Sequence, residues 1–161
     1  MKHEGILRNL VFGTEDSLVS TVGFISGIAV ASVDRRTILL SGIVLVCVEA
    51  FSMGLGSTLS EESVSEARAH RGVRWTSAIR DGLVMFVAYV CAGFLVLAPY
   101  MVGDVERAFT RSISVSLALL FVLGASSARM SGLPVIRRGL RMMILGGLAI
   151  ALGVGVARIL S

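Results

Sequence analysis

An apolar run interrupted by two acids lies near the amino terminus: Phe12-Gly13-Thr14-Glu15-Asp16-Ser17-Leu18-Val19-Ser20-Thr21-Val22-Gly23. A second apolar run ends with Glu49-Ala50-Phe51-Ser52-Met53-Gly54-Leu55-Gly56. Both are apolar enough to lie in lipid, although the first contains Asp16 and the second contains Glu49. An ionised carboxylate in hydrocarbon costs several kcal/mol, so such residues usually face a partner, a cavity or an ion. These stretches therefore indicate membrane helices that carry a polar function.

The composition of the whole chain supports this interpretation. Of its 161 residues, 55% are hydrophobic and 16% are charged, and the mean hydropathy is +0.85. A soluble domain of this length needs more polar surface than this composition supplies. Only helices and closed barrels satisfy the backbone in lipid, and continuous apolar runs favour helices. The sequence predicts an all-α integral membrane protein.

We expect five transmembrane helices in a single domain, residues 1–161, because a span needs roughly 20 apolar residues. Their expected ranges are about 10–32, 37–59, 79–102, 110–128 and 139–160, with a short cytoplasmic helical link at 60–78. The other links are short, which makes neighbouring helices antiparallel. The protein is expected to be multi-pass, in the cell membrane of a prokaryote or in a vacuolar or other organelle membrane of a eukaryote.

The placement of basic residues predicts the orientation. Ten of the 15 Lys and Arg residues fall on the side of the amino terminus if all five spans cross. Positive residues favour the cytoplasmic side, so the N-terminus is expected inside and the C-terminus outside. Because the net charge of +4 lies in short loops, it indicates membrane topology rather than binding of nucleic acid.

Asp16, Glu49 and Met53 are the candidate metal ligands within the membrane. Met53 follows Glu49 by four residues and so lies on the same helical face. Carboxylate oxygens and a thioether on facing helices predict a path for a divalent metal ion. Alternatives remain for each residue. Asp16 could solvate the helix entrance, Glu49 could be protonated and hydrogen-bonded to a neighbouring helix, and Met53 could be core filler.

Glu62, Glu66 and His70 form a second candidate metal site beyond the second span. They are spaced four residues apart, and like charges at this spacing destabilise a helix slightly unless they share a cation. A solvated helical extension explains the segment equally well. The pair Gly23 and Gly27 forms a GxxxG pattern, from which we expect a dimer contact through the first helix.

The sequence offers no sign of an enzyme or of a resident cofactor. It contains no Ser-His-Asp set, phosphate-binding loop or HExxH motif. Cys47 and Cys91 fall inside predicted spans without a CxxC pattern, so we expect two small buried hydrophobic residues rather than a disulfide or zinc site.

Three segments resemble the vacuolar iron transporter family: FGTEDSLVSTVGFISGIA, EAFSMGLGSTLSEESVSEA, and ALLFVLGASSARMSGLPVIRRGLRMMILGGLAIALGVGVARIL. The resemblance extends over nearly the whole chain. It implies a homodimer of five-helix protomers that moves ferrous iron, and often manganese, out of the cytosol against protons. It also implies a path between the protomers, lined by the first two helices, with Asp16 and Met53 at positions that match path residues.

The chain departs from the family pattern at three places. Ser57 stands where the family commonly has Glu, and Glu15-Asp16-Ser17 replaces the usual Asn-Asp-Gly. A short segment with Glu61, Glu62 and Glu66 replaces the long, glutamate-rich cytoplasmic domain of many members. Glu49, two turns before Ser57 on the same face, is the candidate to replace the missing acid.

We therefore expect a homodimeric exporter of Fe²⁺ or Mn²⁺ that works by proton antiport, with metal ions, protons, the bilayer and a second copy as its partners. Burial and nearby charge shift the pKa of a carboxylate, and metal binding then releases protons. One alternative is a transporter of small organic cations that uses Glu49 as a counter-ion. Another is a structural or regulatory membrane subunit without transport activity.

Overall fold

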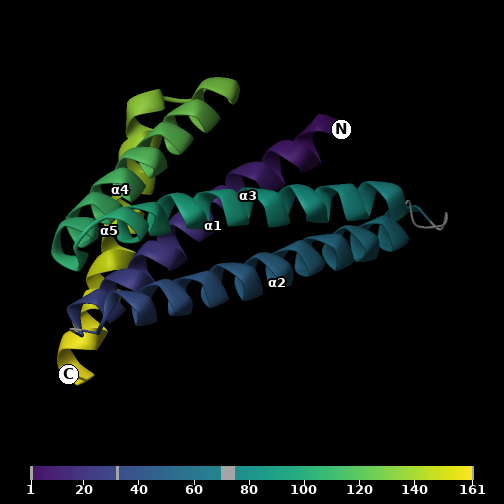
Figure 1. Ribbon diagram of the computed structural model, residues 1–161. Coiled ribbons are helices and arrows are strands. Elements are labelled where there is room, and N and C mark those ends of the chain that lie inside the picture. The colour runs from purple at the N-terminus through teal and green to yellow at the C-terminus, as the bar shows by residue number, and fades with distance from the viewer. Residues whose placement is uncertain (1, 32, 70–74, 161) are drawn as a thin grey trace.

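The computed structural model is entirely helical and describes residues 2–31, 33–69 and 75–160. It contains five helices (Figure 1): α1 (Lys2–Val30), α2 (Arg35–Ala69), α3 (Trp75–Val102), α4 (Val105–Met130) and α5 (Val135–Leu160). This agrees with the expected all-α class and the expected order of elements. Each helix begins before the expected span. The reason is that the helical hydrogen bonds include polar residues at the helix start, and a span predicted from hydropathy does not include such residues.

Four of the described helices, α2 to α5, are long and apolar enough to cross a membrane. The chain is therefore a multi-pass integral membrane protein. In α1 the two acids Glu15 and Asp16, with several Ser and Thr residues, lower the hydropathy. A fifth crossing by α1 stays a prediction, as does the orientation of the termini.

Helix α1 is the central element, because it packs against each of the other four helices. Helices α2 and α3 form one antiparallel hairpin, and α4 and α5 form another (Figure 1). The first half of α1 lies on α3, where Asn9 donates a hydrogen bond of 3.2 Å to the Asp81 carbonyl. Gly13 permits this approach, since a Cβ there would lie 2.9 Å from the Met85 carbonyl oxygen.

The second half of α1 lies on α5, and this contact corrects the interpretation of its GxxxG pattern. A Cβ at Gly27 would lie 2.8 Å from the Gly153 carbonyl oxygen, and one at Gly23 would lie 3.2 Å from that of Ala149. The expectation that Gly23 and Gly27 contact a second chain is wrong, because both glycines pack against α5 of the same chain. Both glycines are buried inside the chain, where they allow the two backbones of α1 and α5 to touch.

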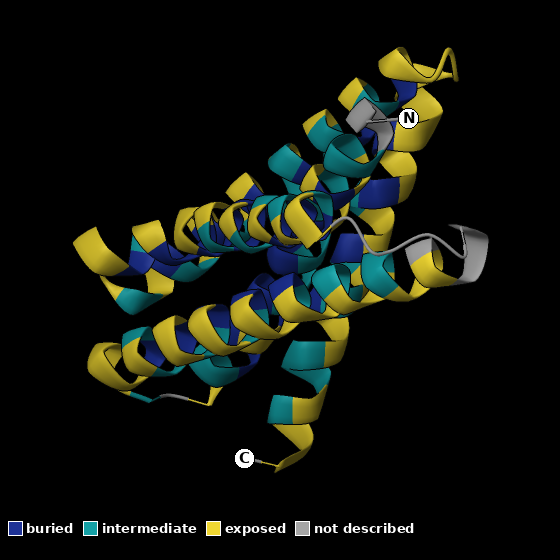
Figure 2. Ribbon diagram, turned by 90° about the vertical axis from the view of Figure 1, so that its right-hand side faces the viewer, coloured by how far each residue is buried: buried dark blue, intermediate teal, exposed yellow. Residues whose placement is uncertain are grey.

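Exposed residues, yellow in Figure 2, lie on the outer faces of the bundle, while buried residues in dark blue lie where helices meet. Many of the exposed residues are large and apolar, among them Leu40, Phe51 and Leu152. Such surfaces suit lipid, which is as apolar as the side chains. The expected burial of Cys47 and Cys91 is wrong, because both lie on these outward faces; both are free thiols.

Helix α2 continues well beyond its expected membrane span and includes the acidic segment up to Ala69. The expected helical continuation is therefore observed as far as that residue. The rest of the expected link is divided between α3, which begins at Trp75, and residues 70–74, which lie outside the described residues.

Candidate functional site

Asp16 on α1 and Glu49 on α2 lie near each other and are both partly buried. Their carboxylates are close enough to repel one another when both are ionised. Within the described ranges, no hydrogen bond or ion pair satisfies either carboxylate. The structure therefore brings together two of the predicted metal ligands, and no cationic side chain among the described residues pairs with either of them.

Tyr89 on α3 completes this polar region and is not among the residues predicted from the sequence. The residue is fully buried, and its hydroxyl lies 2.6 Å from the Ser20 hydroxyl. The Ser17 hydroxyl donates a 2.7 Å hydrogen bond to the Tyr89 carbonyl, so one turn of α1 holds both ends of the residue. Tyr89 is also within electrostatic range of Asp16 and Glu49.

A signal for Tyr89 was present in the sequence. Hydropathy alone predicts the span at about 79–102, but a phenol in the middle of a span must also find a hydrogen-bond partner. That requirement indicates that α3 faces a polar neighbour at Tyr89. The serines of α1 are the partners it finds.

Met53 lies one turn of α2 after Glu49 and lines a groove between α1, α2 and α3. The groove has a volume of about 570 Å³ and is lined by Arg8, Asn9, Phe12, Ser52, Met53, Gly56, Ser57, Ser60 and Met85. Met53 also packs against the buried core that contains Tyr89. The groove thus extends along α2 from Ser60 to the thioether, one turn from Glu49.

Ser57 contributes an open polar atom to this groove. Its hydroxyl oxygen is buried and has no hydrogen-bond partner among the described residues. A buried hydroxyl without a partner costs free energy, which a ligand or water in the groove offsets. The position at which the family resemblance implies an acid therefore still presents an oxygen to the groove.

Arg8 lines the groove and pairs with Glu61 on the extension of α2. The Arg8 guanidinium lies 3.5 Å from the Glu61 carboxylate, and both groups are at least partly exposed. An exposed pair of this kind contributes about 0–1 kcal/mol. It links the beginning of α1 to the extension of α2 and places one cation beside the groove.

The second candidate metal site is only partly described. Glu62 is partly buried and Glu66 is exposed on the extension of α2, whereas His70 lies outside the described residues. At about 100° per residue, Glu62 lies about 140° around the helix from Glu49. The two candidate sites therefore do not share a face of α2, and their cooperation stays a prediction.

The acidic and sulfur donors around Asp16 are too few to form a metal site by themselves. No group of three or more His, Cys, Asp or Glu residues that could hold a metal ion occurs in the part of the chain that the structure describes. Two carboxylates and one thioether supply oxygen and sulfur donors, a set compatible with Mn²⁺ or Fe²⁺. Hydroxyl or carbonyl oxygens, water or a second copy would supply the remaining ligands.

The chain is similar in sequence to known proteins over most of its length. A model of the VIT family matches residues 7–72 and 66–158. A vacuolar iron transporter homolog 1 of Oryza sativa subsp. japonica is 27% identical over 169 residues, covering 95% of this chain and 73% of its own length. A vacuolar iron transporter homolog 2 of Arabidopsis thaliana is 27% identical over 167 residues, covering 96% and 84%. An uncharacterised protein of Methanocaldococcus jannaschii is 25% identical over 163 residues, covering 90% and 84%.

Proposed function

The chain belongs to the VIT family, and on this basis we propose that it transports divalent transition-metal ions, Fe²⁺ or Mn²⁺, out of the cytosol. The observation that carries the proposal is that the partly buried carboxylates of Asp16 on α1 and Glu49 on α2 lie within electrostatic range of each other and of Tyr89 on α3. Two plant relatives are named as iron transporter homologs, which supports iron as a substrate.

Proton exchange follows from the repulsion between the two acids. Two close carboxylates are stable when protons neutralise one or both, or when a divalent cation lies between them. Binding of the metal then expels protons, and protons that arrive from the other side expel the metal. This linkage is sufficient for antiport. Tyr89 remains beside the carboxylates and, through Ser20, fixes the turn of α1 that carries Asp16.

The groove that contains Met53 is the route we propose from the cytosol to this pair. Its outer end carries polar groups, including Ser60 and the Arg8–Glu61 pair, and its inner end carries Met53. A thioether offers a weak, soft ligand, so an ion can pass it without being trapped. The Glu62, Glu66 and His70 segment is proposed as a weak cytoplasmic capture site, separate from this groove.

A homodimer would complete the metal site. A two-fold axis beside α1 and α2 would place a second Asp16 and Glu49 near the first pair, because each copy presents the same surface. The exposed apolar face of α2 supports such a contact: Leu40, Val44, Val48, Phe51, Leu55 and Leu59 are all exposed in the single chain. The buried Gly23 and Gly27 have no part in this arrangement.

Metal flux into proteoliposomes tests the proposal. We expect the purified protein to move Fe²⁺ or Mn²⁺ when a pH gradient is imposed, and to move little without it. The double variant Asp16→Asn/Glu49→Gln keeps the shape of both side chains and removes both titrations, so its flux should be lost while it still folds. Wild-type flux in this folded variant would refute the mechanism. Uptake of a small organic cation instead of metal would favour the counter-ion alternative.

A further inference from the structure

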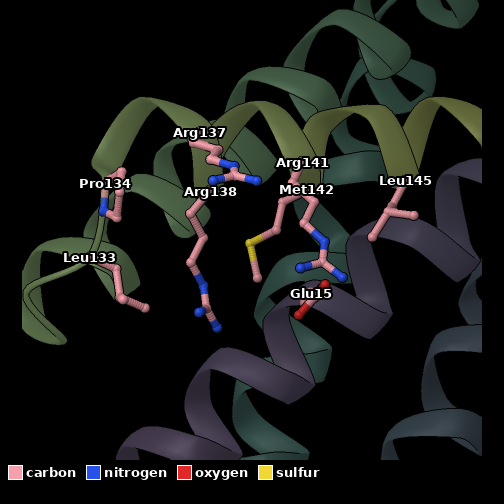
Figure 3. Close-up of a pocket in the computed structure, with 8 residues that line it drawn as sticks. All are labelled: Glu15, Leu133, Pro134, Arg137, Arg138, Arg141, Met142 and Leu145. Carbon is pink, nitrogen blue, oxygen red and sulfur yellow. The ribbon is translucent and has the colours of Figure 1, made fainter.

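A second polar cavity lies on the other side of α1, near the turn between α4 and α5. It has a volume of about 480 Å³ and is lined by Glu15, Leu133, Pro134, Arg137, Arg138, Arg141, Met142 and Leu145. Figure 3 shows Arg138 and Arg141 extending from α5 toward α1, where Glu15 forms the facing wall. We call this cavity the arginine pocket. Neither the metal pathway nor the groove at Met53 includes its residues.

The turn that forms the pocket is defined by its backbone. Gly132 has a φ of 67°, and the Leu133 N–H donates a 2.9 Å hydrogen bond to the Ala128 carbonyl. This is the arrangement in which a glycine ends a helix and reverses the chain. Pro134 follows and α5 begins at once, so Leu133, Pro134 and the first turns of α5 are held in a fixed relation.

The charges in the arginine pocket are not balanced by the protein. Arg138 and Arg141 extend toward the side on which Glu15 lies, and Arg137 lines the same pocket beside α5. Among the described residues none of the three arginines donates a hydrogen bond to another side chain or carbonyl. The first turn of α5 contains no acid. The amino end of a helix already carries partial positive charge, so three arginines in its first two turns favour a bound anion.

We propose that the arginine pocket binds a phosphate group. Arginine matches phosphate oxygens with paired N–H donors and remains charged at every relevant pH. Leu133, Met142 and Leu145 add an apolar wall beside the charges, which suits the glycerol and acyl part of a lipid. A lipid headgroup and a soluble phosphate compound share the chemistry that the arginines recognise. This site does not depend on metal transport.

The test uses the full-length protein in detergent micelles and measures its melting temperature and its apparent affinity for added ligand. Phosphatidic acid, phosphatidylcholine and inorganic phosphate are added separately at matched ionic strength. The variant Arg138→Gln/Arg141→Gln is compared with Arg36→Gln/Arg107→Gln, which removes the same charge from two exposed positions outside the pocket. We expect ligand to raise the melting temperature of the wild type and of the control. In the pocket variant the affinity should fall by about tenfold or more.

The ligand that produces this pattern identifies the source of the phosphate. A response to phosphatidic acid alone supports a lipid headgroup, and a response to inorganic phosphate supports a soluble ligand. An equal response of wild type and pocket variant to every ligand, or no response at all, overturns the proposal. Glu15→Gln provides a second test that does not weaken the pocket: removal of the repelling carboxylate should tighten binding, and unchanged affinity contradicts the assignment.

Discussion

Glu15 and Asp16 are adjacent on α1 but lie in opposite electrostatic surroundings. Glu15 lines the arginine pocket, where Arg138 acts on it as a nearby positive charge. Asp16 faces Glu49, a second negative charge. Consecutive side chains of a helix point about 100° apart, so Glu15 faces α5 whereas Asp16 faces α2. An acid beside arginines has a counter-charge from the protein, whereas an acid beside another acid requires one from outside.

The strongest test of this comparison exchanges the two acids for their amides one at a time. Asp16→Asn should nearly abolish pH-driven metal flux, because it removes half of the carboxylate pair. Glu15→Gln should leave the flux close to wild type, because its counter-charge belongs to a different pocket. Flux into proteoliposomes at equal protein content measures both.

The comparison of the two acids depends on both variants being folded, which the melting temperature in detergent establishes. Equal loss of flux in Glu15→Gln and Asp16→Asn would show that the two acids share one site. It would also remove the distinction between the pathway and the arginine pocket.

The contact between α1 and α5 keeps the two acids in their separate surroundings, and overfilling it should destabilise the protein. Gly27→Leu places a side chain against the Gly153 backbone, where even a Cβ would lie 2.8 Å from the carbonyl oxygen. We expect a loss of about 1–3 kcal/mol or more in the free energy of unfolding. Gly155→Leu is the matched control on α5, because nothing lies within 4 Å of a Cβ there.

Denaturant or thermal unfolding in detergent measures this difference between the two glycine variants. If Gly27→Leu unfolds like the wild type but loses its dimer, then the pattern acts between chains, and the assignment of Gly23 and Gly27 to an internal contact is incorrect.

The helices could be predicted from the sequence, but their pairing could not. Hydropathy identifies a segment that prefers lipid, and this was enough to find the five helices. A GxxxG pattern indicates that another helix can approach this backbone closely, but it does not indicate which helix. The expected partner of Gly23 and Gly27 was therefore a second chain, whereas the observed partner is α5. Periodicity placed Glu49 and Met53 on one face, yet Tyr89 was overlooked because an aromatic residue contributes to hydropathy as an apolar one.

The surroundings of Glu15 could not be predicted from the sequence either. The sequence presents it only as a neighbour of Asp16, and its proximity to Arg137, Arg138 and Arg141 depends on how α5 folds back across α1. Contacts between residues more than a hundred positions apart are set by the packing of whole helices. No local pattern in either helix encodes them.

A substitution at Tyr89, on the Asp16 side of α1, should have a smaller effect on stability than Gly27→Leu. Tyr89→Phe removes the hydrogen bond with Ser20 and should cost about 0.5–1.5 kcal/mol of unfolding free energy. Tyr100→Phe is the matched control, because the Tyr100 hydroxyl is buried and has no hydrogen-bond partner among the described residues. Its removal should be neutral or slightly stabilising.

Unfolding in detergent compares the two tyrosine variants, and metal flux adds a second measurement. We expect Tyr89→Phe to lower flux moderately, because the turn of α1 that carries Asp16 loses one anchor, while Tyr100→Phe leaves flux unchanged. Identical stability of the two variants would mean that the contact between Tyr89 and Ser20 contributes nothing.

Substitution of Asp34 should have the smallest effect on the melting temperature. Unlike Glu15 and Asp16, this acid has neutral hydrogen-bond donors as its partners. It precedes α2, and its carboxylate accepts hydrogen bonds from the Thr37 hydroxyl at 2.6 Å and from the Thr37 N–H at 3.1 Å. These bonds hold the pKa of Asp34 below its ordinary value. A lowered pKa in the folded state stabilises the protein above the unfolded value of about 3.9, and this stabilisation is lost as the pH falls through the folded pKa.

Replacing Asp34 by Ala should therefore lower the melting temperature slightly at pH 7, and the difference from wild type should shrink as the pH falls below about 4. Asp104 precedes α4 in the same way but makes no capping hydrogen bond with its side chain. Asp104→Ala should consequently lower the melting temperature less at pH 7 than Asp34→Ala does. Because both residues are exposed acids before a helix, a shared helix-dipole effect would destabilise both variants equally. Equal falls in melting temperature would thus show that the hydrogen bonds to Thr37 do not stabilise the protein. Asp34 would then differ from Glu15 and Asp16, whose effects depend on neighbouring side chains.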